Sequence, residues 1–217
     1  MIKIRTVFEK NGRAKYISHL DLYRFMLRAF NRSGLPIWYT EGYNPRPYIT
    51  FALALSLGFE SKCENMDFNL NEEVDFDEIK NRLNNVMPEG ILFNSVAFPQ
   101  KKITEIAFAE YGASIATEDS GILLQEFLKF MQKDSILVEK KTKKGMVQTD
   151  IKALSEITNV TQNQDSLDFN VRLPAGTQSN YNPMLLTNAF INEISNKNIS
   201  VKICRNAIIC SDGKKFF

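Results

Sequence analysis

Apolar residues in the first 99 positions change from a two-residue to a 3.6-residue period and back again, twice over. A two-residue period predicts half-buried strands, and a 3.6-residue period predicts amphipathic helices. Strands are predicted at residues 2–9 (continuing through 14–17), 37–40, 48–55, 65–70 and 91–97, and helices at 19–33 and 77–86. With one strand as an addition, this order is β-α-β-β-α-β, which predicts a ferredoxin-like unit.

Residues 104–217 repeat the same order more loosely. Strands are predicted at 106–116, 136–139, 167–173 and 200–210, and helices at 122–132, at 151–157 and from Asn182-Pro183 to about residue 195. Asn before Pro is a favourable helix start, with Asn as the N-cap and Pro as the first helical residue. The sequence therefore predicts an α+β protein of two tandem ferredoxin-like units, at residues 1–99 and 104–217.

Charge is distributed unevenly along a chain whose net charge is only +2. Residues 1–58 hold nine Lys and Arg against three Asp and Glu, whereas residues 59–99 hold three against nine. Two interpretations fit this asymmetry. Either two faces of one domain neutralise each other, or the basic residues form a surface that binds a polyanion.

The features that report on cellular compartment favour the cytoplasm. No apolar run reaches the roughly 20 residues that a membrane helix needs, and the alternating N-terminus does not have the form of a signal peptide. The three cysteines form neither an even framework nor a Cys-x-x-Cys pair, which favours a reducing environment. We therefore expect a cytoplasmic protein with no membrane partner.

Three arginines recur every four residues in the first predicted helix, at Arg24, Arg28 and Arg32. Because each step of four residues advances only about 40° around a helix, their side chains form one stripe. Other positions supply the apolar face, and no acidic residue stands four residues from any of the three. A solvated helix face would explain the stripe; a surface that binds anions, extended by Lys15 just upstream, is the alternative.

Residues 42–47 read Gly-Tyr-Asn-Pro-Arg-Pro. Asn before Pro initiates a turn, and the two prolines stiffen it. A stiff turn would hold Arg46 in place before a ligand arrives, with Tyr43 and Tyr48 beside it. Arginine and tyrosine are suited to phosphate forks and base stacking. The turn and the stripe together predict a nucleic-acid-binding surface; a rigid connection between two strands is the alternative for the turn.

His19 is the only histidine of the chain, and it admits two interpretations. As a general base, with Lys15 or Tyr16 assisting, it would suit a metal-independent ribonuclease. The structural alternative is stronger, because Ser18-x-x-Asp21 has the form of a capping box and would place His19 in the first helical turn. No cluster of further ligands predicts a metal site, and no motif predicts a nucleotide or other cofactor.

The chain resembles the radical SAM-linked protein family, an uncharacterised bacterial family found beside or fused to B12-binding and radical SAM enzymes. The resemblance is carried by Tyr16-Ile17-Ser18-His19-Leu20-Asp21-Leu22 with Arg24, by Gly42-Tyr43-Asn44-Pro45-x-Pro47, and by Met87-Pro88-Glu89-Gly90. It implies a radical SAM enzyme as a partner. The Cys-x3-Cys-x2-Cys motif of radical SAM enzymes is absent from this sequence.

Three functions are consistent with these features. The leading hypothesis is an RNA-binding or substrate-presenting accessory module, without catalytic activity of its own, that works with a radical SAM enzyme. The second is a ribonuclease or RNA-modifying enzyme centred on His19. The third is a protein-interaction scaffold whose basic face docks an acidic partner.

Overall fold

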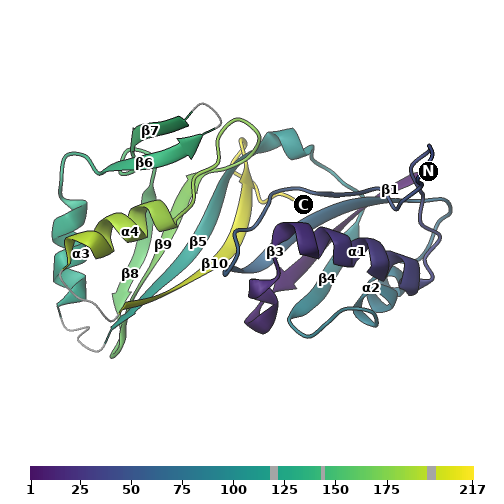
Figure 1. Cartoon of the computed structure of the whole chain (residues 1–217), viewed down its shortest axis with the longest axis horizontal. Coiled ribbons are helices and arrows are strands. Elements are labelled where there is room, and N and C mark those ends of the chain that lie inside the picture. The colour runs from purple at the N-terminus through teal and green to yellow at the C-terminus, as the bar shows by residue number, and fades with distance from the viewer. Residues whose placement is uncertain (118–121, 143–144, 195–198) are drawn as a thin grey trace. The chain divides into compact units, whose positions relative to one another are not determined.

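The structure is a computed structural model that describes residues 1–117, 122–142, 145–194 and 199–217. The described residues form four α-helices and a core that is mostly sheet, so the protein is mixed α+β (Figure 1). The chain divides into two compact units. Unit 1 contains Met1–Ile106 and Gly213–Phe217, and unit 2 contains Ala107–Asp212.

The sheet of unit 1 is antiparallel and is built around its first strand. It contains β1 (Ile2–Lys10), β2 (Ile49–Phe51), β3 (Glu60–Leu70) and β4 (Ile91–Ala97). β1 lies between β4 and β3, and β2 also pairs with β3. Helices α1 (His19–Ser33) and α2 (Phe76–Asn84) lie together on one face of this sheet (Figure 1).

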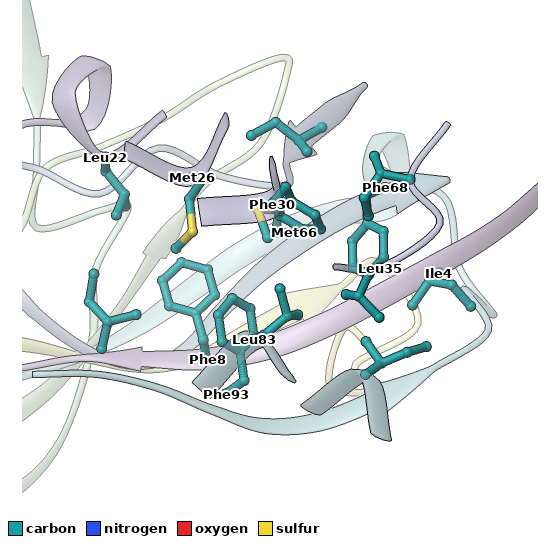
Figure 2. Packing of buried hydrophobic residues seen from close by; sticks show 14 of the residues in the cluster. Ile4, Phe8, Leu22, Met26, Phe30, Leu35, Met66, Phe68, Leu83 and Phe93 are labelled. Carbon is teal, nitrogen blue, oxygen red and sulfur yellow. The ribbon is translucent and has the colours of Figure 1, made fainter. Parts of the chain in front are cut away.

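The core of unit 1 lies between that face and the two helices (Figure 2). β1 contributes alternate residues, Ile4 and Phe8, because successive strand residues point to opposite faces. Helix α1 contributes residues spaced four apart, which are Leu22, Met26 and Phe30. The ring of Phe30 packs edge-on against Phe68 of β3, with centroids 4.7 Å apart.

Helix α1 begins and ends at the residues that its sequence predicts. The hydroxyl of Ser18 accepts a hydrogen bond from the backbone N–H of Asp21 at 3.1 Å, which satisfies one free donor of the first turn. Gly34 ends the helix in the left-handed conformation at φ 66°, where glycine carries no side-chain penalty. The predicted helix and its Ser18 cap are thus confirmed.

The segment between β1 and α1 is a 3₁₀ helix, Gly12–Tyr16, so the predicted strand at 14–17 is wrong. Its backbone hydrogen bonds go to nearby turns: Asn11 N–H donates to the carbonyl of Gly90 at 2.8 Å, and Ala14 N–H to that of Asn11 at 3.0 Å. Gly90 has φ 87°, and a side-chain carbon there would lie 2.4 Å from the Asn11 carbonyl oxygen. Only glycine fits this close approach.

The predicted strand at 37–40 is also wrong. Only two isolated bridges form there, between Ile37 and Leu70 and between Tyr39 and Pro47. Pro36 and Pro47 have no backbone N–H, so a continuous ladder is not available on either side of this short segment. The strand predicted at 48–55 shortens to β2, and residues 52–59 form turns and irregular backbone.

Unit 2 contains a four-stranded antiparallel sheet and a separate hairpin. The sheet has neighbours in the order β10-β5-β9-β8. Its strands are β5 (Ile106–Thr117), β8 (Glu156–Gln162), β9 (Ser166–Pro174) and β10 (Ile199–Cys210). The hairpin pairs β6 (Leu137–Thr142) with β7 (Gly145–Asp150). Helices α3 (Leu123–Met131) and α4 (Met184–Glu193) cover one face of the sheet.

The buried face of this sheet is made by odd-numbered residues. In β9 they are Leu167, Phe169, Val171 and Leu173. Phe127 of α3 stacks on Phe169 with centroids 4.6 Å apart and meets Phe190 of α4 edge-on at 5.1 Å. Even-numbered residues of β5 and β9 therefore point to the opposite face, away from both helices.

The predicted helix at 151–157 is wrong. One turn forms there, with Leu154 N–H donating to the carbonyl of Ile151 at 3.3 Å, and β8 begins at Glu156. Strands β7 and β8 were not predicted. Helix α4 begins at Met184 with Pro183 as its N-cap, one residue later than predicted, and Oδ1 of Asn182 accepts from the N–H of Met184 at 2.9 Å. The predicted end of that helix, near residue 195, lies outside the described residues.

Candidate nucleic-acid interface

Helix α1 turns its three arginines away from the core. Its apolar positions are taken up by the residues that pack on the sheet, and the steps that remain carry Arg24, Arg28 and Arg32. All three side chains are exposed. The four-residue spacing therefore produces a cationic stripe along the solvent side of one helix, as the sequence predicts.

The surroundings of the three arginines differ. Nη1 of Arg24 donates to Oδ1 of Asp21 at 3.5 Å, a pair three residues apart in which both side chains are exposed. Nη2 of Arg32 donates to the carbonyl oxygen of Val86 at 3.4 Å. Within the described ranges, Arg28 has no ion pair or hydrogen bond through its side chain. Exposed pairs of this kind contribute about 0–1 kcal/mol, so an anion would displace them at little cost.

The acidic residues of 59–99 do not neutralise this stripe. Asp77 and Glu78 pair with lysine and arginine within α2 itself, while Glu60 and Asp67 pair with cations of β1 and the 3₁₀ helix. In the described part of the chain, no carboxylate from residues 59–99 forms an ion pair with Arg24, Arg28 or Arg32. Mutual neutralisation therefore explains other parts of the charge asymmetry and not the stripe.

The turn after α1 is closed by backbone contacts at its base. Thr40 N–H donates to the carbonyl of Arg46 at 2.9 Å, and Arg46 N–H donates to the Thr40 hydroxyl at 3.3 Å. The next pair of residues, farther from the tip of the loop, is Tyr39 and Pro47, which form an isolated β-bridge. The guanidinium of Arg46 lies outside this closure and is exposed. The contacts fix the ends of the loop and leave its tip to solvent.

A side-chain hydrogen bond joins this turn to the helix that carries the stripe. The hydroxyl of Tyr39 donates to Oδ1 of Asn31 at 2.6 Å, and Asn31 lies on the exposed side of α1 next to Arg32 in sequence. The turn is therefore docked on α1, so the cations of the stripe and the groups of the loop belong to one surface. Tyr39 and Asn31 were not predicted as site residues, and no local pattern marks a contact between a helix and a later turn.

Two tyrosines of the loop are open to solvent to different degrees. Tyr43 is 99% exposed, so its whole ring is free to stack. Tyr48 is 45% exposed and packs edge-on against Trp38, with ring centroids 6.0 Å apart. Trp38 holds the ring of Tyr48 in place and leaves part of it accessible. Both tyrosines can offer a face to an unstacked base.

Lys15 is the predicted cation that fits the interface least well. It lies in the 3₁₀ helix before α1, and its Nζ is 3.4 Å from Oε1 of Glu60. Its side chain is only 21% exposed. The pair with Glu60 reduces the net charge that Lys15 can offer to a phosphate.

His19 lies at the other end of α1 from the turn, over a small group of charged side chains. Its ring packs edge-on against Phe51, with centroids 5.2 Å apart. The pKa of His19 is lowered from its ordinary 6.5, first by desolvation, with Glu64 opposing the shift and Lys10 adding to it. His19 is therefore neutral at pH 7 and able to accept a proton.

Lys10 and Glu64 are the members of this group that the sequence analysis missed. Both are almost completely buried. Nζ of Lys10 donates to the carbonyl of Ile17 at 2.7 Å, and burial lowers the pKa of Lys10, with Glu64 raising it. A signal was present: Lys10 has the same parity in β1 as core Phe8, so it points toward the helices.

The sequence was compared with known proteins. It matches, over residues 3–183, a family described as an uncharacterised protein conserved in bacteria, DUF2344. The chain belongs to this family. No curated protein matches it.

The described residues of this DUF2344 protein contain neither a metal-binding cluster nor a membrane-spanning helix. Among the described residues, no group of three or more His, Cys, Asp or Glu side chains is placed to hold a metal ion. No helix of the described chain has the length and apolar character required to span a membrane.

Proposed function

We propose that this protein is an RNA-binding or substrate-presenting accessory module, and that the exposed side of α1 with its docked turn is the contact surface. The observation that carries the proposal is the hydrogen bond between Tyr39 and Asn31, which joins the turn to the helix that carries the arginines. Guanidinium groups at a four-residue spacing contact phosphates, and free tyrosine rings stack on bases.

A single-stranded RNA suits this surface better than a duplex. Phosphate contacts need only exposed cations, which Arg24, Arg28 and Arg46 supply. Stacking needs bases that are already unpaired, and the full exposure of Tyr43 has no structural purpose within the chain. The expected mode is binding with little sequence preference through the stripe, strongly dependent on salt.

The fold and cellular context are proposed with it. In unit 1, β3 lies between β1 and β2 and is antiparallel to both. In unit 2, β9 lies in the same way between β5 and β8. Ferredoxin-like units have this arrangement. The hairpin of β6 and β7 would then be an insertion in the second unit. The resemblance to the radical SAM-linked family supports a cytoplasmic location and a radical SAM enzyme as the partner that acts on the bound substrate.

The test is a charge reversal with a matched control. Arg24→Glu/Arg28→Glu is compared with Lys129→Glu/Lys202→Glu, which changes the net charge equally at exposed positions of unit 2. Binding of a labelled single-stranded RNA of mixed sequence is measured between about 50 and 200 mM salt. The stripe variant should bind more weakly and lose about 1.4 from the salt slope, because two contacts contribute about 0.7 each.

The outcomes separate the three hypotheses. Equal slopes for the stripe variant, the control and the wild type would refute the proposal. Cleavage of the RNA that disappears in His19→Ala would favour the ribonuclease, which the neighbouring Glu64 and Lys10 make chemically reasonable. Absence of RNA binding, with a nuclease-resistant protein complex that the stripe variant abolishes, would favour the scaffold.

A further inference from the structure

The open face of the unit 2 sheet carries a polar hollow. It has a volume of about 240 Å³, and its lining includes Glu110, Asn170, Arg172 and Asn206. These residues come from three neighbouring strands, β5, β9 and β10. Glu110 of β5 and Asn170 and Arg172 of β9 are even-numbered, so their side chains lie on the face away from α3 and α4.

Gly112 lies beneath two of the residues that line this hollow, Asn170 and Asn206. It pairs with Asn170 across β5 and β9. A side-chain carbon at Gly112 would lie 3.1 Å from Nδ2 of Asn206 and 3.5 Å from Oδ1 of Asn170. The two carboxamides therefore lie over the glycine, which carries no side chain of its own. A glycine in a strand interior marks a place where another group approaches the backbone closely.

Both carboxamides are available to a ligand. In the described part of the chain, the side chains of Asn170 and Asn206 form no hydrogen bond. Each amide has two donors and an acceptor oxygen. Asn170 is half-buried and Asn206 exposed, so the first is the one for which an unfilled hydrogen-bonding capacity is costly.

One wall of the hollow is a row of paired charges. Arg172 donates through Nε to Oε1 of Glu110 at 3.1 Å and through Nη1 to Oε2 of Glu156 at 3.2 Å. The row carries two carboxylates and one guanidinium, so its net charge is −1. It does not suit a phosphate. The second oxygen of each carboxylate is left to accept from a neutral N–H donor.

An irregularity in β8 also lies beside the hollow. The register between β8 and β9 shifts between Thr158 and Thr161, and Asn159 there has φ 52°, a left-handed conformation. Bulges of this kind turn an edge strand away and occur beside binding sites. Here β8 still borders the hollow on its outer side, through Glu156, Thr158 and Asn159.

We propose that this hollow binds a nucleobase that carries an exocyclic amino group. A flat base edge would approach the two carboxamides, with an acceptor nitrogen facing Nδ2 of Asn206 and its amino group facing Oδ1 of Asn170 and Glu110. Asparagine side chains contact base edges in this paired donor–acceptor manner. Uracil has no amino group and would bind more weakly.

The inference does not depend on the cationic stripe, because a nucleoside carries no phosphate. The base can belong to a free nucleoside or to an unpaired residue of RNA, and the experiment distinguishes these sources. Adenosine, guanosine, cytidine and uridine are titrated into the full chain by calorimetry. In a second arm, a labelled single-stranded RNA is titrated at a salt concentration at which phosphate contacts contribute little.

Gly112→Val places a branched side chain against the two carboxamides, and Ser114→Val places the same side chain on the same face of the same strand outside the hollow. The double variant Asn170→Ala/Asn206→Ala removes the amides without adding bulk. We expect both hollow variants to weaken binding of the amino-bearing base by at least about tenfold, in line with the loss of a bidentate contact. Ser114→Val should bind as the wild type does, and so should Arg24→Glu/Arg28→Glu in the nucleoside arm.

Dependence on the hollow variants in the nucleoside arm would identify a free nucleoside as a ligand. The same dependence confined to the RNA arm would identify a base within a strand. The proposal is overturned if neither arm shows binding that the hollow variants reduce, or if uridine binds as tightly as the amino-bearing nucleosides.

Discussion

The face of the unit 1 sheet opposite α1 and α2 holds a buried ion pair that makes a sharp prediction. Arg5 of β1 stands opposite Asp67 of β3 in the register. Nε and Nη2 of Arg5 donate to the two carboxylate oxygens of Asp67 at 2.7 and 2.9 Å. The side chains are only 1% and 3% exposed, and the ring of Phe216 lies 4.1 Å from the guanidinium carbon.

The perturbation is Asp67→Asn, which keeps the shape and removes the charge. An amide oxygen can accept one of the two hydrogen bonds, and Nη1 of Arg5 still donates to the carbonyl of Lys101 at 2.9 Å. The guanidinium would remain buried without a counter-charge. Breaking such a buried pair costs about 3–5 kcal/mol, and the hydrogen bonds that remain place the expected loss near the lower value, about 3 kcal/mol.

Glu78→Gln is the matched control, because it makes the same carboxylate-to-amide change in an arginine pair on the surface of α2. Glu78 and Arg82 are 47% and 40% exposed, and exposed pairs at this spacing contribute about 0.3–0.5 kcal/mol. The free energy of unfolding is measured by urea denaturation for the wild type and both variants. Equal losses in the two variants would refute the reasoning, because they would show that burial does not strengthen dependence on the counter-charge.

Three further predictions follow from local contacts. Gly90→Ala should destabilise the protein by more than about 2 kcal/mol, because strain at positive φ and a clash with a backbone carbonyl add together. Gly213→Ala is the control, at φ 78° with nothing within 4 Å, and should cost only about 1 kcal/mol. Similar urea midpoints for the two variants would contradict this. The unfolded chain protonates His19 more readily than the folded one, so stability should fall as pH falls from 6.5 toward the lowered pKa; His19→Gln should lack that part of the pH dependence, and parallel profiles would argue against it. Asn182→Ala should cost about 1 kcal/mol in a thermal melt through loss of the α4 cap, and an unchanged melting temperature would count against the cap.

The parts of the fold that the sequence predicts well are those decided locally. Helix α1 has a serine cap, a 3.6-residue apolar period and a glycine stop within 17 residues, and each acts through its own backbone neighbours. The errors lie where distant partners decide. Residues 12–16 form a 3₁₀ helix, next to a hydrogen bond from Asn11 to Gly90, which is 79 positions away. Periodicity contains no information about such a contact.

The candidate interface also has features that the local sequence predicts and features that depend on distant partners. The stripe of Arg24, Arg28 and Arg32 follows from spacing within one helix, so the sequence predicts both its existence and its exposure. Its relation to the turn depends on Tyr39 reaching Asn31, which the tight turn at Gly34 and the two isolated bridges make possible. Lys15 has the composition of a phosphate contact but is paired with Glu60, a partner 45 residues later in the chain.

The hollow beside Gly112 is a kind of site that composition does not predict, whereas a stripe of arginines is one that it does. Arginine stripes are visible in a sequence because charge is visible, yet contacts to phosphate position a nucleic acid without reading it. Recognition of a base edge needs side-chain amides, and carboxylates whose charge is largely offset by a neighbouring cation. In a sequence these residues resemble the ordinary polar residues of a strand. Glu110, Arg172 and Glu156 come from three strands and cancel most of one another's charge. A protein with both surfaces would separate retention of a polyanion from recognition of a base, and loss of either function by mutation should leave the other measurable.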